Sequence, residues 1–438
     1  MGESFRNNMN HWTDAARRAH RAHGLYQRGR WVEAAAELRA ALTMNPCNSG
    51  WQFNLAMTLE AMEDYDDACE AYARAASLDG GEIETRCAWG ACLVRAGRYW
   101  QAIEHFSDVA RDEPDYEPAY CYRIQAYAQL GLHEQAELMF YLARQIEDDC
   151  PHCFYHMGES FYARGEFARA LACWQRTEAL AVGYPRISQA LADAQCAMGQ
   201  LDAAATTLRH ALHEKGWEAD VLCQLADVLR QKGLLDEARQ RILCVVHGTP
   251  DDPAGYRGLA EIEEDAGNIA AAITHYRKAL ALSGDHDTLL PLARALLRVG
   301  ERAEAIAHLR AALVMRYDQP DALSELGSLF LQAGCGLESH EALSRLAKCR
   351  NDDPACWNRL AACCFTLGRL REGLVHARRA LKCDRAFGPA LYNLAVAHRR
   401  LGHWPRARHY AARAWEADPA NRRYRQLFRS LRRRRRSL

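Results

Sequence analysis

The stretch Pro151–Tyr184, with the sequence PHCFYHMGESFYARGEFARALACWQRTEALAVGY, decides the fold, because its residue types recur every 34 positions along the chain. With Pro151 as position 1, Gly158 occupies position 8, Gly165 position 15 and Ala170 position 20. A fixed period of about 20–50 residues is typical of proteins whose repeats pack only on their neighbours. Twelve repeats begin at Ala15, Ser49, Ile83, Glu117, Pro151, Pro185, Ala219, Pro253, His286, Pro320, Pro354 and Gly388.

Three positions define each repeat. Position 8 is small in eleven repeats, with Ile124 as the exception, and position 15 is Gly in eleven, with Glu63 in its place once. Position 20 is Ala in ten repeats, and in the other two it is occupied by Ser339 and by Gly373. Gly at position 15 predicts the end of a helix, because Gly adopts the left-handed conformation without steric cost. Small residues at positions 8 and 20 allow two helices to approach closely, since larger ones would overpack the crossing.

Each repeat is therefore predicted to be a helical hairpin. Apolar residues at positions 4, 7, 8 and 11, and again at 17, 20, 24 and 27, follow helical spacing. Eleven of the thirteen prolines lie at repeat boundaries, where Pro185 for example opens a first helix, and Pro405 begins a second helix. Pro291 falls at position 6, so its helix is expected to start late, capped by Asp287, with Pro291 in the first turn. The loss of one residue before His286 predicts a slight irregularity at 285–291.

This pattern resembles the tetratricopeptide repeat family over residues 15–421. Ile83–Tyr116 matches the family at Trp89, Gly90, Gly97, Tyr99, Ala102, Phe106 and Pro114. Gly388–Asn421 matches at Leu394, Ala395, Gly402, Trp404, Ala407, Ala414 and Pro419. The resemblance implies an all-α fold: an α-solenoid in which about twelve helical hairpins form a right-handed superhelix.

Segments outside the repeats are expected to be short. Residues 1–14 are interpreted as an N-terminal leader, and residues 422–438 as a cap helix that continues into an Arg-rich tail. Tyr424, Leu427, Phe428 and Leu431 give the cap helix one apolar face, as the last repeat of such an array requires.

Composition narrows the class of protein. The net charge is zero, but residues 385–438 hold 15 Arg and only Glu416 and Asp418 as acids, so the rest of the chain is acidic. The first residues lack the apolar segment of a secretory signal, and no run reaches the ~18 apolar residues of a membrane helix. Seventeen cysteines without a loop framework indicate reduced thiols. We therefore expect a soluble, cytoplasmic protein without a transmembrane segment.

No catalytic motif is recognised, so no enzymatic activity and no cofactor are expected. The motif Cys150-Pro-His-Cys153 has two chemical interpretations: a redox dithiol, or a zinc site completed by His152 and His156. The interpretation that is favoured is a loop cysteine before a helix-opening proline, with no metal. The other cysteines are expected to act as small core residues, among them Cys87, Cys121 and Cys223 at position 5.

The resemblance implies that first helices line a concave groove through positions 2, 5, 6, 9, 12 and 13. Position 9 is acidic in four consecutive repeats, and we name Glu159, Asp193, Asp227 and Glu261 the acidic ladder. Such a lining would select a basic partner. Aromatic residues suited to interface hot spots stand beside it, at Tyr122, Tyr155, His156 and Tyr162. These eight residues are the predicted partner-binding site, and an ordinary solvated helix face is the alternative.

The predicted function is a non-enzymatic scaffold that binds a peptide or protein segment in the groove, with a basic segment as one option. A first alternative is an adaptor for nucleic acid or an anionic membrane surface, which would use Arg422, Arg423, Arg425, Arg429 and Arg432–Arg436. Nucleic acid is the less favoured partner, because a terminal Arg run is commonly a solubilising end. A metal or redox protein based on Cys150 and Cys153 is the second alternative. The oligomeric state is left open.

Overall fold

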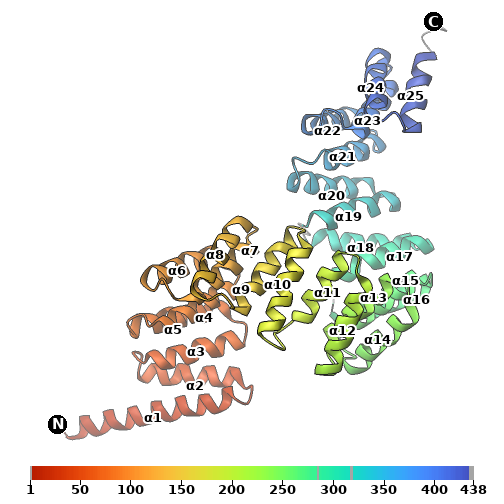
Figure 1. Ribbon diagram of the computed structural model, residues 1–438. Coiled ribbons are helices and arrows are strands. Elements are labelled where there is room, and N and C mark those ends of the chain that lie inside the picture. Colours follow the sequence, from red (N-terminus) through yellow and green to blue (C-terminus); the bar gives the residue numbers. More distant parts are fainter. Residues whose placement is uncertain (1, 284–285, 316–318, 434–438) are drawn as a thin grey trace. The chain divides into compact units, whose positions relative to one another are not determined.

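The structure, a computed structural model, describes residues 2–283, 286–315 and 319–433, and over these residues it contains helices and no strand (Figure 1). The predicted all-α fold of helical hairpins is confirmed. The chain divides into two compact units, Met1–Gly216 and Trp217–Leu438, called the first and second unit below. Each unit is described by itself.

The first unit holds the helices α1 (Gly2–Tyr26), α2 (Trp31–Met44), α3 (Ser49–Ala61), α4 (Tyr65–Leu78), α5 (Ile83–Arg95), α6 (Tyr99–Asp112), α7 (Glu117–Gln129), α8 (His133–Ile146), α9 (Pro151–Ala163), α10 (Phe167–Leu180), α11 (Ile187–Ala197) and α12 (Leu201–Lys215). Helix α1 starts before the first repeat, so the segment interpreted as a leader is helical from Gly2 onward.

The second unit holds α13 (Ala219–Gln231), α14 (Leu235–Gly248), α15 (Pro253–Asp265), α16 (Ile269–Ser283), the short 3-10 helix η1 (His286–Thr288), α17 (Leu289–Val299), α18 (Arg302–Val314), α19 (Pro320–Ala333), α20 (Gly336–Cys349), α21 (Pro354–Thr366), α22 (Leu370–Cys383), α23 (Gly388–Arg400), α24 (Trp404–Ala417) and α25 (Arg422–Arg433). Odd-numbered helices up to α23 are the first helices of the repeats, and the even-numbered helices are the second.

Position 15 forms the turn inside every hairpin. All eleven glycines at this position have a positive φ, as at Gly165 with +77°. The N–H of Gly165 donates to the carbonyl of Tyr162 at 2.9 Å, which closes the end of α9. Glu63, the one residue at position 15 that is not Gly, takes the same left-handed conformation with φ +61°. The backbone geometry is therefore kept even where the residue type changes.

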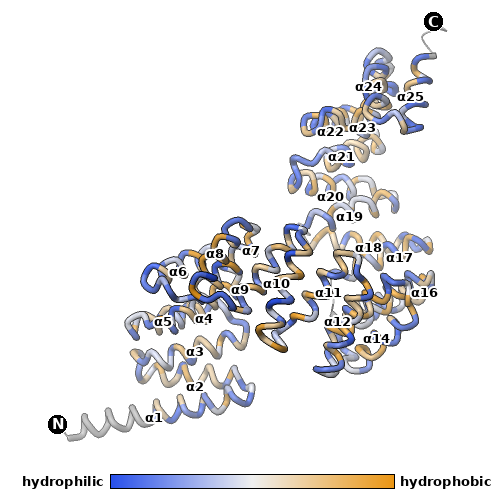
Figure 2. Tube along the Cα trace, in the orientation of Figure 1, coloured by the Kyte–Doolittle hydropathy of each residue, from blue (hydrophilic) through white to orange (hydrophobic). Residues whose placement is uncertain are grey.

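Small residues at position 8 lie where the two helices of a hairpin cross. A Cβ built on Gly158 would stand 2.7 Å from Cδ1 of Trp174, and one on Gly327 would stand 2.7 Å from Cγ of Leu343. Buried apolar residues from successive repeats form continuous clusters within each unit. Figure 2 shows hydrophobic and hydrophilic residues interspersed along the helices, as expected for helices that bury one face.

Two local details differ from the prediction. Helix α11 begins at Ile187, because Arg186 has φ +60° and cannot continue a helix from Pro185. In the irregular repeat, η1 precedes α17, and Pro291 lies in the first turn of α17 as predicted. The residue that caps α17 is Thr288, however, and not Asp287.

The last helix, α25, covers the end of the final repeat. Its residues Tyr424, Leu427 and Leu431 are buried against the final repeat. Phe428 of α25 stacks on Trp415 of α24 with ring centroids 5.2 Å apart. The predicted cap helix is thus confirmed. The tail residues 434–438, which include the end of the predicted Arg run, lie outside the described residues. Among the described helices, none combines the length and apolarity needed to cross a bilayer.

Candidate partner-binding groove

In the first unit, three consecutive first helices enclose a pocket of ≈ 280 Å³, called the groove pocket. Helices α5, α7 and α9 supply its lining, and every lining residue occupies position 1, 2, 5 or 6 of its repeat: Cys87, Glu117, Pro118, Cys121, Tyr122, His152 and His156. Positions 2, 5 and 6 are among those that the family resemblance assigns to the groove. Two predicted site residues, Tyr122 and His156, therefore share one pocket.

Both of these side chains are fixed by neighbours. The ring of Tyr122 stacks on Phe106 with centroids 5.0 Å apart and an interplanar angle of 8°. Nδ1 of His156 lies 2.8 Å from the Glu159 carboxylate, and the two residues stand three positions apart on α9. Glu159 thus hydrogen bonds to an imidazole. These contacts limit the motion of the Tyr122 and His156 side chains, which lowers the entropy cost of binding a partner there.

Tyr155 and Tyr162 contact an aromatic group that continues from the pocket along α9. Tyr155 packs on Tyr184 with centroids 4.9 Å apart, and Tyr162 packs on Trp174 at 5.7 Å. The indole N–H of Trp174 donates to the carbonyl of Tyr155 at 3.1 Å, which fixes the ring beneath both tyrosines. Partial burial raises the pKa of both tyrosine hydroxyls, so both stay protonated and able to donate hydrogen bonds.

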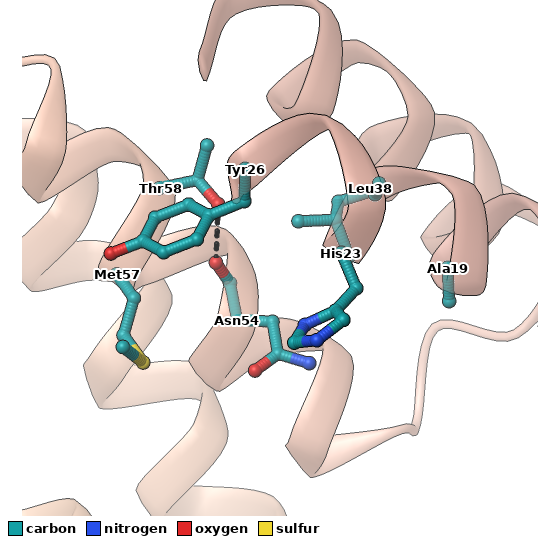
Figure 3. Close-up of a pocket in the computed structure, with 8 residues that line it drawn as sticks. Ala19, His23, Tyr26, Leu38, Asn54, Met57 and Thr58 are labelled. Carbon is teal, nitrogen blue, oxygen red and sulfur yellow. Dashed lines mark hydrogen bonds between the residues drawn. The ribbon is translucent and has the colours of Figure 1, made fainter. Parts of the chain in front are cut away.

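A second pocket in the first unit, of ≈ 130 Å³, was not predicted from the sequence (Figure 3). Residues of α1, α2 and α3 line it, and Figure 3 shows the His23 ring and the Asn54 amide directed into it beside Tyr26 and Met57. These four residues occupy positions 9, 6, 12 and 9 of their repeats. The same groove positions that singled out the predicted site could therefore have indicated this pocket too.

The acidic ladder is only partly an open acidic surface. Asp193 is exposed on α11 of the first unit. In the second unit, Arg230 on α13 reaches both ladder residues: its guanidinium lies 3.6 Å from Asp227 and 3.2 Å from Glu261 on α15. It also contacts Asp265 at 2.9 Å. One arginine therefore offsets the charge of three neighbouring carboxylates.

Arg230 is a charged neighbour of the acidic ladder that was not predicted from the sequence. It stands three residues after Asp227, a spacing at which two side chains share a helix face, so the signal was present. Loss of water raises the pKa of the carboxyl groups of Asp227 and Glu261, and Arg230 acts in the opposite direction on both. These ladder carboxylates are thus less available to a basic partner than their sequence suggests.

The cysteine motif has a different environment from the one considered in the sequence. His152 contacts the hydroxyl of Tyr184 at 2.8 Å, and His156 contacts Glu159, so both imidazoles already have partners outside the cysteine pair. Cys150 and Cys153 instead lie with Glu117 and Cys121 of α7. The interpretation of Cys121 as an ordinary core residue is therefore incomplete.

We call Glu117, Cys121, Cys150 and Cys153 the thiol cluster. Their close contacts shift the pKa values of all four groups. Burial raises the pKa of the Glu117 carboxyl to about 7. Hydrogen bonds from Cys121 and Cys153 hold the pKa of the Cys150 thiol well below its usual range, while the pKa values of the other two thiols are raised by the same contacts. These contacts thus shift the pKa values of neighbouring thiols in opposite directions.

The hairpins, the left-handed turn at position 15 and the shared face of first helices define a helical-repeat protein of the kind that serves as a scaffold for protein interactions. The family model of the tetratricopeptide repeat matches residues 20–83, 223–287 and 290–354. These three regions consist of tetratricopeptide repeats, as the sequence pattern indicated.

Among curated proteins, the chain is similar to the TPR repeat-containing protein YpiA of Bacillus subtilis, with 21% identity over 252 residues, or 57% of this chain and 59% of that protein. It is 30% identical over 194 residues to the cellulose synthase operon protein C of Pseudomonas fluorescens, or 42% of this chain and 15% of that protein. The chain spans less than two thirds of either relative. A solved structure of the human IFIT1 dimer with PPP-AAAA aligns with a TM-score of 0.47 at 16% identity, covering 85% of this chain and 90% of that one.

Proposed function

We propose that this chain is a non-enzymatic scaffold that binds a peptide or protein segment along the first helices of its first unit, at the groove pocket. The observation that carries the proposal is the pocket of ≈ 280 Å³ that three consecutive repeats line at equivalent positions. An extended segment can contact all three repeats at once, because their first helices lie next to one another. Tyr122 and His156 inside the pocket, with Tyr155 and Tyr162 beside it, are the proposed anchors.

The partner segment that suits this surface carries basic residues. Glu117 lines the pocket, Glu159 lies beside it on α9 and Asp193 is exposed on α11. Carboxylates at the rim of an aromatic site favour a cationic partner and speed its association. In the second unit, Asp227 and Glu261 are proposed as a weaker contact, because Arg230 must first be displaced from them. The seventeen cysteines, all free thiols, support action in a reducing compartment such as the cytoplasm.

The test uses the full chain and a library of linear peptides displayed on phage. We expect enriched peptides to contain Lys or Arg beside an apolar residue, and the variant Tyr162→Ala combined with Glu159→Gln to weaken their binding by at least about tenfold. Trp100→Ala is the matched control, because Trp100 is an aromatic residue, 62% exposed, on the second helix α6. If the Trp100 variant loses as much affinity as the groove variant, or if the groove variant loses none, the proposed site is wrong.

A second candidate function has its own observation. Helix α25 turns Arg422, Arg425 and Arg429 to solvent on the side opposite its buried apolar face. This surface could bind a phosphate backbone or an anionic bilayer, and the affinity would then fall steeply with salt. Replacing the three arginines by Gln preserves the helix and removes the charge. Binding of duplex DNA, duplex RNA or phosphatidylserine vesicles that is lost in this variant would support the alternative.

A further inference from the structure

The thiol cluster joins two adjacent repeats of the first unit. Glu117 and Cys121 stand four residues apart on α7, a spacing that places both on one helix face. Cys150 is the N-cap of α9, where its sulfur accepts the N–H of Cys153 at 3.4 Å. One ligand atom from each of the four side chains lies within 4.8 Å of all the others. The residues come from one helix and from the start of the next first helix.

The cysteines of this cluster are deeply buried and contact one another. Cys121, Cys150 and Cys153 are only 6%, 5% and 1% exposed. The thiol of Cys153 donates to the Glu117 carboxylate at 2.8 Å, although 36 residues separate the two in sequence. Three sulfurs and one carboxylate thus converge on a common point in a site largely closed to water. Cysteines that serve only as small core residues have no need to converge in this way.

The chemistry of this donor set selects the ion. Thiolates are soft ligands that favour zinc over calcium or magnesium, which take oxygen ligands. In a tetrahedral zinc site the metal–sulfur distance is ~2.3 Å, which separates neighbouring sulfurs by about 3.8 Å. This spacing fits within the 4.8 Å that the four ligand atoms share. Four protein ligands also leave no open coordination position, which is the arrangement of a structural site.

We propose that Glu117, Cys121, Cys150 and Cys153 bind one zinc ion that joins α7 to α9. The ion adds a metal link between two repeats that also meet through apolar packing and through ion pairs such as that of Arg169 with Glu137. Because Glu117 and Cys121 also line the groove pocket, the ion holds that wall of the pocket in place. The zinc site does not depend on the proposed peptide binding, and each can be tested without the other.

Two rival arrangements are distinguishable. A disulfide between Cys150 and Cys153 would engage two of the four groups and leave Cys121 and Glu117 unexplained. A second group in the second unit, formed by His340, Cys364, Glu372 and His376, also brings four ligand atoms within 4.8 Å. It offers a single thiol, whereas the thiol cluster offers three. This group therefore serves as a comparison site in the test.

The first experiment measures zinc by elemental mass spectrometry on the full chain, purified under reducing conditions, supplied with Zn²⁺ and passed through gel filtration. We expect one equivalent in the wild type and in Cys364→Ser, and at least about tenfold weaker retention in Cys121→Ser and Glu117→Gln. Cys87→Ser is the matched control, because Cys87 lines the same pocket at the same repeat position as Cys121 but lies outside the cluster. Its zinc content should equal that of the wild type.

The second experiment remains informative if a cysteine variant folds poorly. Addition of Co²⁺ to the wild-type chain should produce the thiolate-to-cobalt charge-transfer and visible bands of a tetrahedral site, and equimolar Zn²⁺ should remove them. The proposal is overturned if the wild type retains no zinc and gives no such bands, or if Cys364→Ser loses the ion while Cys121→Ser keeps it. A count of fifteen instead of seventeen thiols in the chain isolated without reductant, then denatured with a chelator present, would also overturn it in favour of the disulfide.

Discussion

Arg230 on α13 places a guanidinium nitrogen 3.2 Å from the carboxylate of Glu261 on α15, one repeat further along the chain. The same side chain approaches Asp227 on its own helix. This contact between neighbouring first helices partly neutralises the negative charge of the acidic ladder in the second unit. The ladder there is an ion-pair network with a surplus of negative charge, and not a row of unpaired carboxylates.

Replacing Arg230 by Ala should lower the free energy of unfolding by about 1 kcal/mol at neutral pH, since exposed ion pairs contribute little individually but three share this arginine. The substitution leaves Asp227, Glu261 and Asp265 as neighbouring like charges. Urea unfolding of the wild type and the variant at low and high salt measures the effect, which salt should reduce. Arg371→Ala, which changes an exposed arginine on the second helix α22, is the control for loss of charge alone.

The same variant should show a distinct pH dependence. Loss of water raises the pKa of Asp227 and Glu261 in the folded chain, so the folded state keeps these protons to a higher pH than the unfolded state. Their stabilising contribution is present at low pH and is lost as pH rises through the raised pKa values. Without Arg230 the pKa values should rise further, so the stability of the variant should fall more steeply as the pH rises above the ordinary pKa range of Asp and Glu. Parallel pH profiles of the two proteins would contradict the network.

A repeated tyrosine contact provides a third prediction. The hydroxyl of Tyr276 donates to Glu264 at 3.3 Å, and that of Tyr72 donates to Glu60 at 3.2 Å, six repeats earlier. Each tyrosine is buried at position 24, and each glutamate stands at position 12. Replacing either tyrosine by Phe should cost about 1 kcal/mol, because the ring remains and only the hydrogen bond is lost. Thermal unfolding measures this, with the exposed Tyr141→Phe expected to have no effect.

Glu63→Gly should stabilise the protein. Glu63 is the residue at position 15 that is forced into a left-handed conformation, with φ +61°, where the other eleven repeats have Gly. A side chain in this conformation costs about 1–2 kcal/mol, and the greater freedom of Gly in the unfolded chain removes part of that gain. We expect a net increase of roughly 0.5–1 kcal/mol in the free energy of unfolding. The reverse change Gly97→Ala, at the same position of the next repeat, should have the opposite sign.

Gly158→Ala should destabilise the hairpin of α9 and α10. The added Cβ would overlap the ring of Trp174, and relief requires this large buried side chain to move. The expected cost is roughly 1–3 kcal/mol, measured by chemical denaturation. Gly24→Ala on α1 is the control, because nothing lies within 4 Å of a Cβ there and Ala favours a helix by up to about 1 kcal/mol. A stabilising Gly158→Ala would contradict the role assigned to position 8.

Most of the fold could be predicted from the sequence because the determining signals are local. Three signals act within one repeat: Gly at position 15, a small residue at position 8 and the helical spacing of apolar residues. The same pattern occurs in about twelve copies, which makes it easy to recognise. The departures arise at single residues, such as Arg186, whose left-handed backbone delays α11. Nothing in the repeat pattern encodes such a backbone angle.

Less of the candidate site than of the fold could be predicted from the sequence. The pattern assigned Tyr122 and His156 to groove positions, and the structure brings them to one pocket; their role in binding a partner stays a prediction. Arg230 could have been found from its spacing to Asp227, but its contact with Glu261 crosses to the next repeat and could not. The pocket at His23 and Asn54 lay at positions that the pattern had already marked as groove positions.

The sequence by itself determined that this protein is a chain of about twelve helical hairpins, because periodic burial and turn geometry are properties of each repeat. Only the tertiary structure decided which side chains from neighbouring repeats meet. Cys121 joined Cys150 and Cys153, and Arg230 reached Glu261, through the stacking of first helices and the direction of individual side chains. A period of 34 residues fixes the stacking of repeats, but it does not specify the contacts that give each pair of repeats its own chemistry.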